Sequence, residues 1–198
     1  MSEPNTKCGN QEILRLSNLE SNRLTRESIE CALVLLMKEQ PFAAISITQI
    51  VRRAGVSRTA YYRNYSSKED ILRSMIQEVA TSTFEAMNSH DPAEQPFEFW
   101  LAMFEAVGPH ADSYRVLLSA GFGEAILNQI HSQGLMSVPA SDEESRYSAI
   151  FWNGAAYAVL TEWIKSEQPR SEREMAELCS RIMNLHPEER RQQEGESP

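Results

Sequence analysis

The amino-acid sequence predicts an all-α protein. Apolar residues recur at the i, i+3, i+4 spacing of a helix through nearly the whole 198-residue chain. Strand signals do not occur: the sequence has no sustained apolar–polar alternation and no Asn-Gly hairpin turn. Its 41% hydrophobic and 24% charged residues are ordinary for a globular protein and exclude a disordered chain, a collagen-like repeat and a disulfide miniprotein. The length fits one domain or two small ones.

Two helices and a tight turn are expected first. Residues 24–39 carry a helical apolar stripe, and Pro41 ends this helix because proline cannot continue the hydrogen-bond ladder. Ser46 is placed as the N-cap of a short second helix over residues 47–54. Gly55 follows it, at a position that favours a left-handed backbone.

Two more helices follow the turn. Ser57 is the expected N-cap of a short helix that carries aromatic residues as far as Tyr65. Ser66 and Glu69 have the spacing of a capping box, which predicts the start of a long helix reaching about Asn88.

The rest of the chain predicts a second group of helices, separated by glycine and proline. Gly108-Pro109 and Pro169 mark two of the breaks, and residues 134–140 are expected to be a loop. The expected helices cover about residues 97–107, 111–119, 121–133, 142–166 and 171–185. Divided into domains, the prediction is an N-terminal extension at 1–21, expected to be flexible, a helix-turn-helix domain at 22–68, a larger helical domain at 69–188 and a charged tail at 189–198.

Charge is distributed unevenly. The whole chain has a formal net charge of −9, but residues 22–68 contain eight basic and three acidic residues. A basic segment on an acidic protein suggests that this segment binds a polyanion, although a chance excess on a solvated face would look the same.

Catalysis, metal binding and membrane insertion find no support in the sequence. The three cysteines are far apart, and the four histidines share no metal-binding spacing. No nucleophile elbow or phosphate-binding loop is present. No apolar run is long enough for a membrane span, and residues 1–10 are too polar for a secretory signal. We therefore expect a cytoplasmic protein that is not an enzyme and has no catalytic residue, cofactor or metal.

The segment from Ser46 to Tyr65 reads as a helix-turn-helix. Gly55 supplies the tight turn, and the small Ala54 lets the two helices approach closely. The second helix then exposes side chains that can reach phosphates and base edges in a major groove: Arg58, Thr59, Tyr62, Arg63 and Asn64. A helical hairpin in an ordinary bundle is the alternative, but its exposed face would be rich in Glu and Lys.

At this point the sequence resembles a known family. Ile45-Ser-Ile-Thr-Gln-Ile-Val, Ala54-Gly-Val-Ser-Arg-Thr-Ala-Tyr-Tyr-Arg-Asn-Tyr65 and Lys68-Glu-Asp-Ile-Leu72 are similar to the DNA-binding domain of TetR-type transcriptional regulators. The resemblance implies an all-helical homodimer whose N-terminal helices bind an operator half-site. It implies that the C-terminal domain dimerises and, in many members, holds a ligand.

The resemblance also maps candidate DNA contacts onto the chain. These are Thr48, Ser57, Arg58, Thr59, Ala60, Tyr62, Arg63 and Lys68. Thr48, Tyr62 and Lys68 are expected at phosphates, and Arg58 and Thr59 at base edges. Ala60 and Asn64 depart from the common residues of the family. Arg52 and Arg53 are equally consistent with phosphate contacts and with a solvated helix face.

Two further sets of residues in the C-terminal domain are candidates. An apolar effector pocket is predicted to be lined by Trp100, Met103, Phe104, Phe122 and Trp152, with a plain packed core as the alternative. A dimer interface is predicted at Tyr147, Phe151, Gly154, Tyr157, Ala158, Met175, Leu178 and Ile182. The expected function is a repressor that a small hydrophobic effector releases from a palindromic DNA operator. An activator or coactivator controlled by a partner protein remains open, as does a helical module whose head no longer binds DNA.

Overall fold

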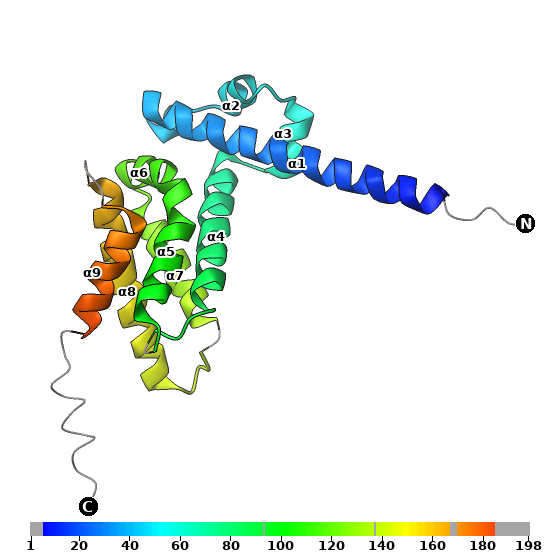
Figure 1. Ribbon diagram of the computed structural model, residues 1–198. Coiled ribbons are helices and arrows are strands. Elements are labelled where there is room, and N and C mark those ends of the chain that lie inside the picture. The colour runs from blue at the N-terminus through cyan, green and yellow to red at the C-terminus, as the bar shows by residue number, and fades with distance from the viewer. Residues whose placement is uncertain (1–5, 93, 137, 167–169, 185–198) are drawn as a thin grey trace, which may run out of the picture. The chain divides into compact units, whose positions relative to one another are not determined.

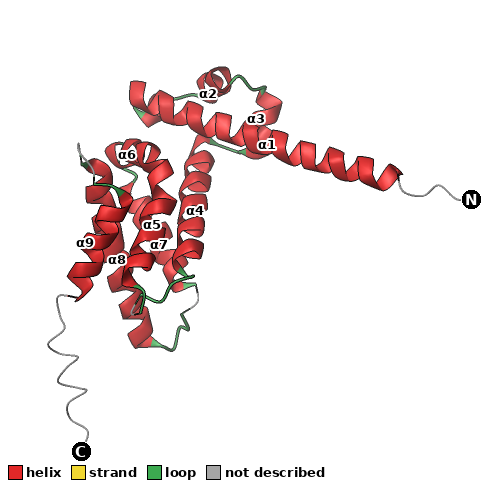
Figure 2. Ribbon diagram, in the orientation of Figure 1, coloured by secondary structure: helices red, strands yellow, loops and turns green. Residues whose placement is uncertain are grey.

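The computed structural model describes residues 6–92, 94–136, 138–166 and 170–184. Within these residues the regular elements are helices, so the all-α prediction is confirmed (Figure 2). The chain divides into two compact units, residues 1–75 and 76–198. The division falls inside a long helix rather than at its start, where the sequence placed the end of the first domain.

Unit 1 is the N-terminal group of helices. It contains α1 (Thr6–Glu39), the short 3-10 turn η1 (Phe42–Ala44), α2 (Ile47–Ala54), α3 (Arg58–Asn64) and the first turns of α4 (Lys68–Met87). Helix α1 packs against α2 and α3 (Figure 1). The core between them is formed by side chains with at most 5% of their surface exposed: Ile29, Leu33, Leu36, Ile45, Ile50, Tyr61, Tyr65, Ile71 and Leu72.

Helix α1 begins earlier than expected. The sequence predicted a flexible extension over residues 1–21 and a helix from residue 24, but the helix already runs from Thr6 to Glu39. No proline lies between these two residues, and Gly9 is the one glycine there. Because nothing in this stretch breaks a helix, the ladder continues toward the N-terminus. Residues 1–5 lie outside the described part.

The turn between α2 and α3 has the predicted geometry. Ser46 accepts a hydrogen bond from the backbone of Gln49, whose side chain in turn accepts one from the backbone of Ser46. Gly55 has φ +68°, in the left-handed region that favours glycine. Ser57 caps α3 by accepting a hydrogen bond from Ala60 N–H. The two helices are therefore fixed at both sides of the turn.

The start of α4 differs from the prediction by one residue. The sequence placed the capping box at Ser66 and Glu69, but the hydroxyl of Ser67 accepts from Asp70 N–H. The Asp70 carboxylate reaches back to Ser66, accepting from its N–H and its hydroxyl at 3.0 Å each. These hydrogen bonds lower the pKa of Asp70. Because two serines are adjacent, either could cap the helix. Ser67 does so, and the Asp70 side chain supplies the return hydrogen bonds to Ser66.

Unit 2 is the larger helical group. Beyond the end of α4 it contains α5 (Pro96–Val107), the 3-10 turn η2 (Gly108–His110), α6 (Ala111–Ser119), α7 (Gly123–Leu135), α8 (Glu143–Lys165) and α9 (Glu172–Asn184). Helix α5 packs on α9, and α8 packs on α6 and α7. Helix α7 starts two residues later than expected because Gly121 adopts φ +89° and interrupts the helical backbone. The predicted cap of α9 at Ser171 is confirmed by its hydrogen bonds with Glu174.

No helix in the described part of the chain is both long and apolar enough to cross a membrane.

Candidate functional site

Helix α3 presents one exposed and one buried face. Tyr61 is completely buried and Tyr65, which follows the helix, is 3% exposed, so the two rings fasten α3 to unit 1. Arg58, Thr59, Tyr62 and Arg63 are exposed, while Ala60 is half-buried. The exposed side chains therefore offer two guanidinium groups, the hydroxyl of Thr59 and the phenol of Tyr62, which are suited to contacts with phosphates and base edges.

Arg58 is held in place by the preceding helix. Its Nη2 donates to Thr48 Oγ1 at 2.5 Å, and both side chains are exposed. Two of the predicted DNA contacts thus lie side by side although they are ten residues apart. Ser57, also predicted as a contact, uses its hydroxyl to cap α3.

A polar cluster that sequence reasoning missed lies behind α3. The Tyr65 hydroxyl donates to Glu30 Oε1 at 2.5 Å, and Arg26 Nε donates to Tyr65 Oη at 3.3 Å. Arg26 also donates to Ser74 Oγ on α4 at 2.8 Å. Burial and the neighbouring Glu30 carboxylate raise the pKa of Tyr65. Because the partners are separated by 35 to 48 residues, no local pattern could have indicated this cluster.

Lys68 makes contacts within unit 1 that the sequence did not predict. The sequence assigned it to a phosphate, but its Nζ donates to the carbonyl oxygens of Phe42, Ala43 and Ile45 at 2.7, 3.1 and 2.9 Å. The ammonium also lies 4.6 Å from the centre of the Phe42 ring. An ammonium has three donors, and all three are used here. Lys68 therefore fastens η1 to α4, and a phosphate contact would require it to leave these carbonyls.

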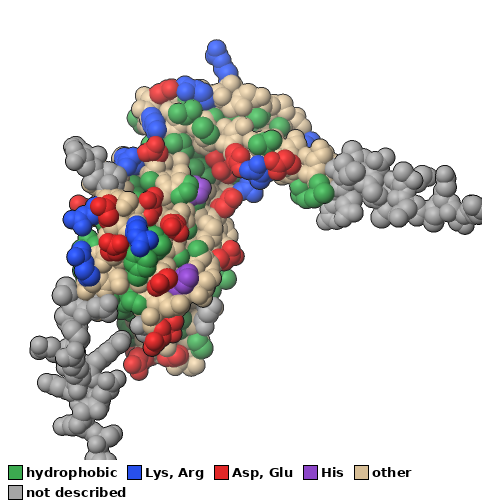
Figure 3. All heavy atoms as spheres, viewed as in Figure 1, with side chains coloured by type: hydrophobic (Ala, Val, Ile, Leu, Met, Phe, Trp, Pro, Cys, Tyr) green, Lys and Arg blue, Asp and Glu red, His purple; other side chains and the backbone are tan. Residues whose placement is uncertain are grey.

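The two arginines that the sequence left open differ in their surroundings. Arg53 Nη2 lies 2.8 and 2.7 Å from the two carboxylate oxygens of Glu39, so it makes an ion pair within unit 1. Arg52 is exposed on the same helix. Lys and Arg side chains gather around α2 in the space-filling view, in keeping with the basic composition of this segment (Figure 3).

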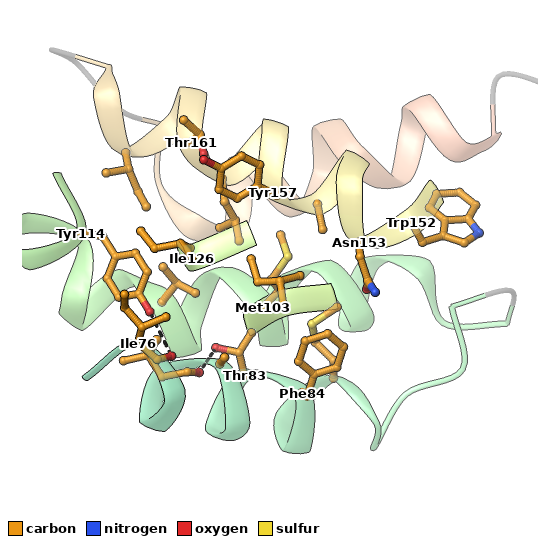
Figure 4. A pocket seen from close by; sticks show the side chains of 18 of the residues that line it. Ile76, Thr83, Phe84, Met103, Tyr114, Ile126, Trp152, Asn153, Tyr157 and Thr161 are labelled. Atoms are coloured by element: carbon orange, nitrogen blue, oxygen red, sulfur yellow. Dashed lines mark hydrogen bonds between the residues drawn. The ribbon is translucent and has the colours of Figure 1, made fainter. Parts of the chain in front are cut away.

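An apolar cavity of about 190 Å³ lies inside unit 2 (Figure 4). Residues of α4, α5, α6, α7 and α8 line it. Of the five predicted lining residues, Trp100, Met103 and Trp152 are at its wall and Phe104 and Phe122 are not. Phe104 is completely buried elsewhere, with its ring 5.1 Å from that of Trp163. Phe122 directly precedes α7. Helical spacing identified apolar faces here, but not which side of a helix meets the cavity.

Helices α8 and α9 expose large apolar side chains. The exposed fraction is 66% for Tyr147, 67% for Phe151 and 53% for Ile182. Of the other residues predicted at a dimer interface, Ala158 is exposed, whereas Gly154, Met175 and Leu178 are half-buried. Tyr157 turns instead toward the cavity, which it helps to line. Exposed apolar side chains that form one large contiguous patch commonly mark an interaction site.

No group of three or more His, Cys, Asp or Glu side chains in the described residues is arranged to hold a metal ion. Cys179 is buried, which raises the pKa of its thiol to about 11 and makes it a poor nucleophile.

Comparison with known proteins identifies the N-terminal helices. Residues 32–75 match the family model of bacterial regulatory proteins, tetR family. The N-terminal helices therefore resemble the DNA-binding helices of that family. The matched segment contains the turn at Gly55 and both helices around it. The chain is also 35% identical over 78 residues to the uncharacterized HTH-type transcriptional regulator YxbF of Bacillus subtilis (strain 168). That match covers 39% of this chain but only 20% of YxbF, so the chain spans about a fifth of this relative.

Solved structures share the fold over most of the chain. A regulator from Syntrophomonas wolfei str. Goettingen, assigned to the TetR family, superimposes with a TM-score of 0.62 at 15% identity and covers 82% of this chain and 94% of its own. The TetR transcriptional regulator from Streptococcus agalactiae 2603V gives 0.52 at 15% identity, covering 85% and 98%. The dihydroxyacetone kinase operon activator DhaS gives 0.51 at 20% identity, covering 81% and 93%. At these identities the likeness concerns the fold.

Proposed function

We propose that the protein is a dimeric, sequence-specific DNA-binding regulator of transcription. The observation that supports this best is the exposed face of α3, where Arg58, Thr59, Tyr62 and Arg63 project from a helix fastened by Tyr61 and Tyr65. A helix of this kind reads base edges when it lies in the major groove. Arg58 and Thr59 contact bases, while Thr48, Tyr62 and Arg63 contact the phosphate backbone.

Dimerisation is part of the proposal because one short recognition helix reads few base pairs. Two copies joined through the exposed apolar side chains of α8 and α9 present two recognition helices to a near-palindromic operator. Half-sites one helical turn apart, about 34–36 Å, match such a dimer. The buried apolar area of Tyr147, Phe151 and Ile182 would supply the driving force for association.

Control of DNA binding is assigned to the cavity of unit 2. An effector that binds the cavity only in a conformation unable to bind DNA shifts the population toward that conformation. The loss of operator affinity is then set by the difference between the effector's affinities for the two conformations. We therefore propose a repressor released by a small hydrophobic molecule. The alternative is an activator or coactivator of the same fold that a partner protein controls, with the exposed apolar side chains of α8 and α9 as the docking surface.

Selection of bound sequences from a random duplex DNA pool at about 0.15 M salt tests the proposal, since specific binding must survive this ionic strength. An enriched palindrome is expected. Failure to enrich any sequence, with a folded and dimeric protein, would refute autonomous operator binding and favour an obligate partner or a head that no longer binds DNA. Analytical ultracentrifugation of the same sample checks the dimer independently.

A further inference from the structure

We infer that the ligand of the unit 2 cavity is a neutral, largely apolar molecule that carries one hydrogen-bond acceptor, which binds the side-chain amide of Asn153. This inference rests on the proposed effector function and adds the chemical class of the effector. Three observations carry it: the composition of the wall, the unpaired nitrogen of Asn153 and the size of the cavity.

The wall of the cavity excludes charged ligands. Among the described residues that line it, no side chain is acidic, basic or a histidine. An ion that enters such a cavity loses its hydration and gains no counter-charge, which is strongly unfavourable. Phosphorylated compounds, carboxylates and ammonium compounds are therefore poor candidates, and a neutral molecule is favoured.

Two hydroxyl groups at the wall already have partners within the protein. The hydroxyl of Thr83 donates to the carbonyl oxygen of Val79 at 2.6 Å. The hydroxyl of Tyr114 lies 3.5 Å from the carbonyl oxygen of Ile76 and points along the same side of the cavity (Figure 4). These contacts satisfy donors of α4 and α6 without a ligand.

The amide nitrogen of Asn153 differs from these two hydroxyl groups. Its side chain is only 8% exposed, yet Nδ2 has no hydrogen-bond partner among the described residues. Figure 4 shows the side chain of Asn153 projecting from α8 at the same end of the cavity as Phe84 and Trp152. A buried donor without an acceptor is unfavourable, so a ligand that supplies an acceptor gains affinity by relieving this state.

A glycine on the neighbouring helix makes room for the amide. A Cβ atom at Gly134 of α7 would lie 2.1 Å from Nδ2 and 2.7 Å from Oδ1 of Asn153. The amide thus packs directly on the backbone of Gly134. The terminal torsion of an Asn side chain is soft, so a rotation of the amide about this bond turns Nδ2 toward the cavity without moving α8.

The volume limits the ligand to one or two rings. The cavity measures about 190 Å³. For comparison, an apolar cavity of about 150 Å³ takes up benzene. Together these features describe a molecule such as a small aromatic ketone.

Three naphthalenes of closely similar shape test this class with the full-length protein. These are 2-acetonaphthone, which has a carbonyl acceptor, 2-isopropylnaphthalene, which has none, and 2-naphthoate, which is charged. Titration calorimetry is expected to show the ketone binding about tenfold more tightly than the hydrocarbon, the effect of one net hydrogen bond, and no binding of the carboxylate. Binding of 2-naphthoate as tight as that of the ketone, or no binding of any of the three, would overturn the inference.

Variants locate the site. Asn153→Leu keeps the side-chain volume and is expected to abolish the preference for the ketone while the hydrocarbon still binds. The control Asn88→Leu changes an exposed asparagine at the rim of the same cavity and is expected to keep the preference. Ala156→Phe fills the cavity and is expected to abolish binding of both neutral probes.

Circular dichroism checks the fold of each variant. If Asn153→Leu keeps the ketone preference, Asn153 is not the ligand's partner; if that variant fails to fold, the three probes on the unmodified protein still decide.

Operator binding separates this inference from the proposed function. Selective ketone binding with unchanged operator affinity would support the ligand class and contradict effector control. Intact operator binding without any probe binding would contradict the ligand class and leave the DNA-binding proposal standing.

Discussion

The guanidinium of Arg58 donates a 2.5 Å hydrogen bond to the hydroxyl of Thr48, joining the first residue of α3 to α2 across the turn at Gly55. A charged group hydrogen-bonded to a neutral hydroxyl in water is easily released, because the net gain of such an exposed contact is small. The contact restricts the rotamers of Arg58 in the free protein and so lowers the entropy lost when it binds a base.

Replacing Arg58 by Ala should therefore relax sequence preference. If Arg58 makes a bidentate base contact, the change costs about 1–3 kcal/mol on the best operator and less on other sequences. Competition binding with the selected operator and single-base variants measures this. The control is Arg173→Ala, which removes an exposed arginine from α9. An Arg58→Ala protein with unchanged base preferences would contradict the assignment.

Lys68→Met should destabilise unit 1 rather than weaken phosphate binding. It removes an ammonium that serves three carbonyl oxygens of the η1 segment, and hydrogen bonds to a charged group contribute about 1.5–3 kcal/mol. Denaturant unfolding should show this loss, while the salt dependence of DNA binding by the folded protein stays the same. A slope reduced by about one, the value for one lost phosphate contact, would restore the phosphate role. Arg63→Met, on the exposed face of α3, is the matched comparison and should reduce that slope.

Tyr61 should make the protein sensitive to alkaline pH. Its hydroxyl is buried and has no hydrogen-bond partner in the described part of the chain, and burial raises the pKa of Tyr61 to about 12. The unfolded chain loses this proton near pH 10, so stability is fully present below pH 10 and is lost as the pH rises toward 12.

Tyr61→Phe should flatten this pH dependence and leave stability at pH 7 unchanged or higher, because the hydroxyl has no partner to lose. Unfolding midpoints at several values between pH 8 and 11.5 measure both effects. Tyr62→Phe, on the exposed side of the same helix, is the control and should retain the slope. A large loss of stability at pH 7 in Tyr61→Phe would mean that the hydroxyl is paired.

Phe151→Glu and Ile182→Glu should each convert the proposed dimer into a monomer. Both side chains are more than half exposed in the single chain, so a carboxylate costs the folded monomer little, while burial of that charge at an interface is strongly unfavourable. Sedimentation velocity gives the oligomeric state. Glu177→Gln changes an exposed charge on α9 and serves as the control. If both glutamate variants sediment as the unmodified protein does, the interface lies elsewhere.

The sequence by itself determined the all-α class and the helix-turn-helix, although it placed the start of α1 too late. Ser46, Gly55 and Ser57 act on backbone groups within a few residues of themselves, so their spacing was enough to predict the turn and both caps. Apolar periodicity likewise identified apolar faces on α5, α8 and α9, but not which residues of these faces line the cavity. These signals depend only on residues that are close together in the sequence, so a single sequence is enough to detect them.

Only the tertiary structure decided which distant groups meet. Lys68 binds carbonyl oxygens 23 to 26 residues away, and the Asn153 amide packs on Gly134 of another helix. Phe104 and Trp152 have similar helical patterns, yet the first is buried against Trp163 and the second lines the cavity. The physical reason is that packing fixes the rotation of each helix about its axis and the partner of each polar group. Both depend on neighbours that are remote in sequence.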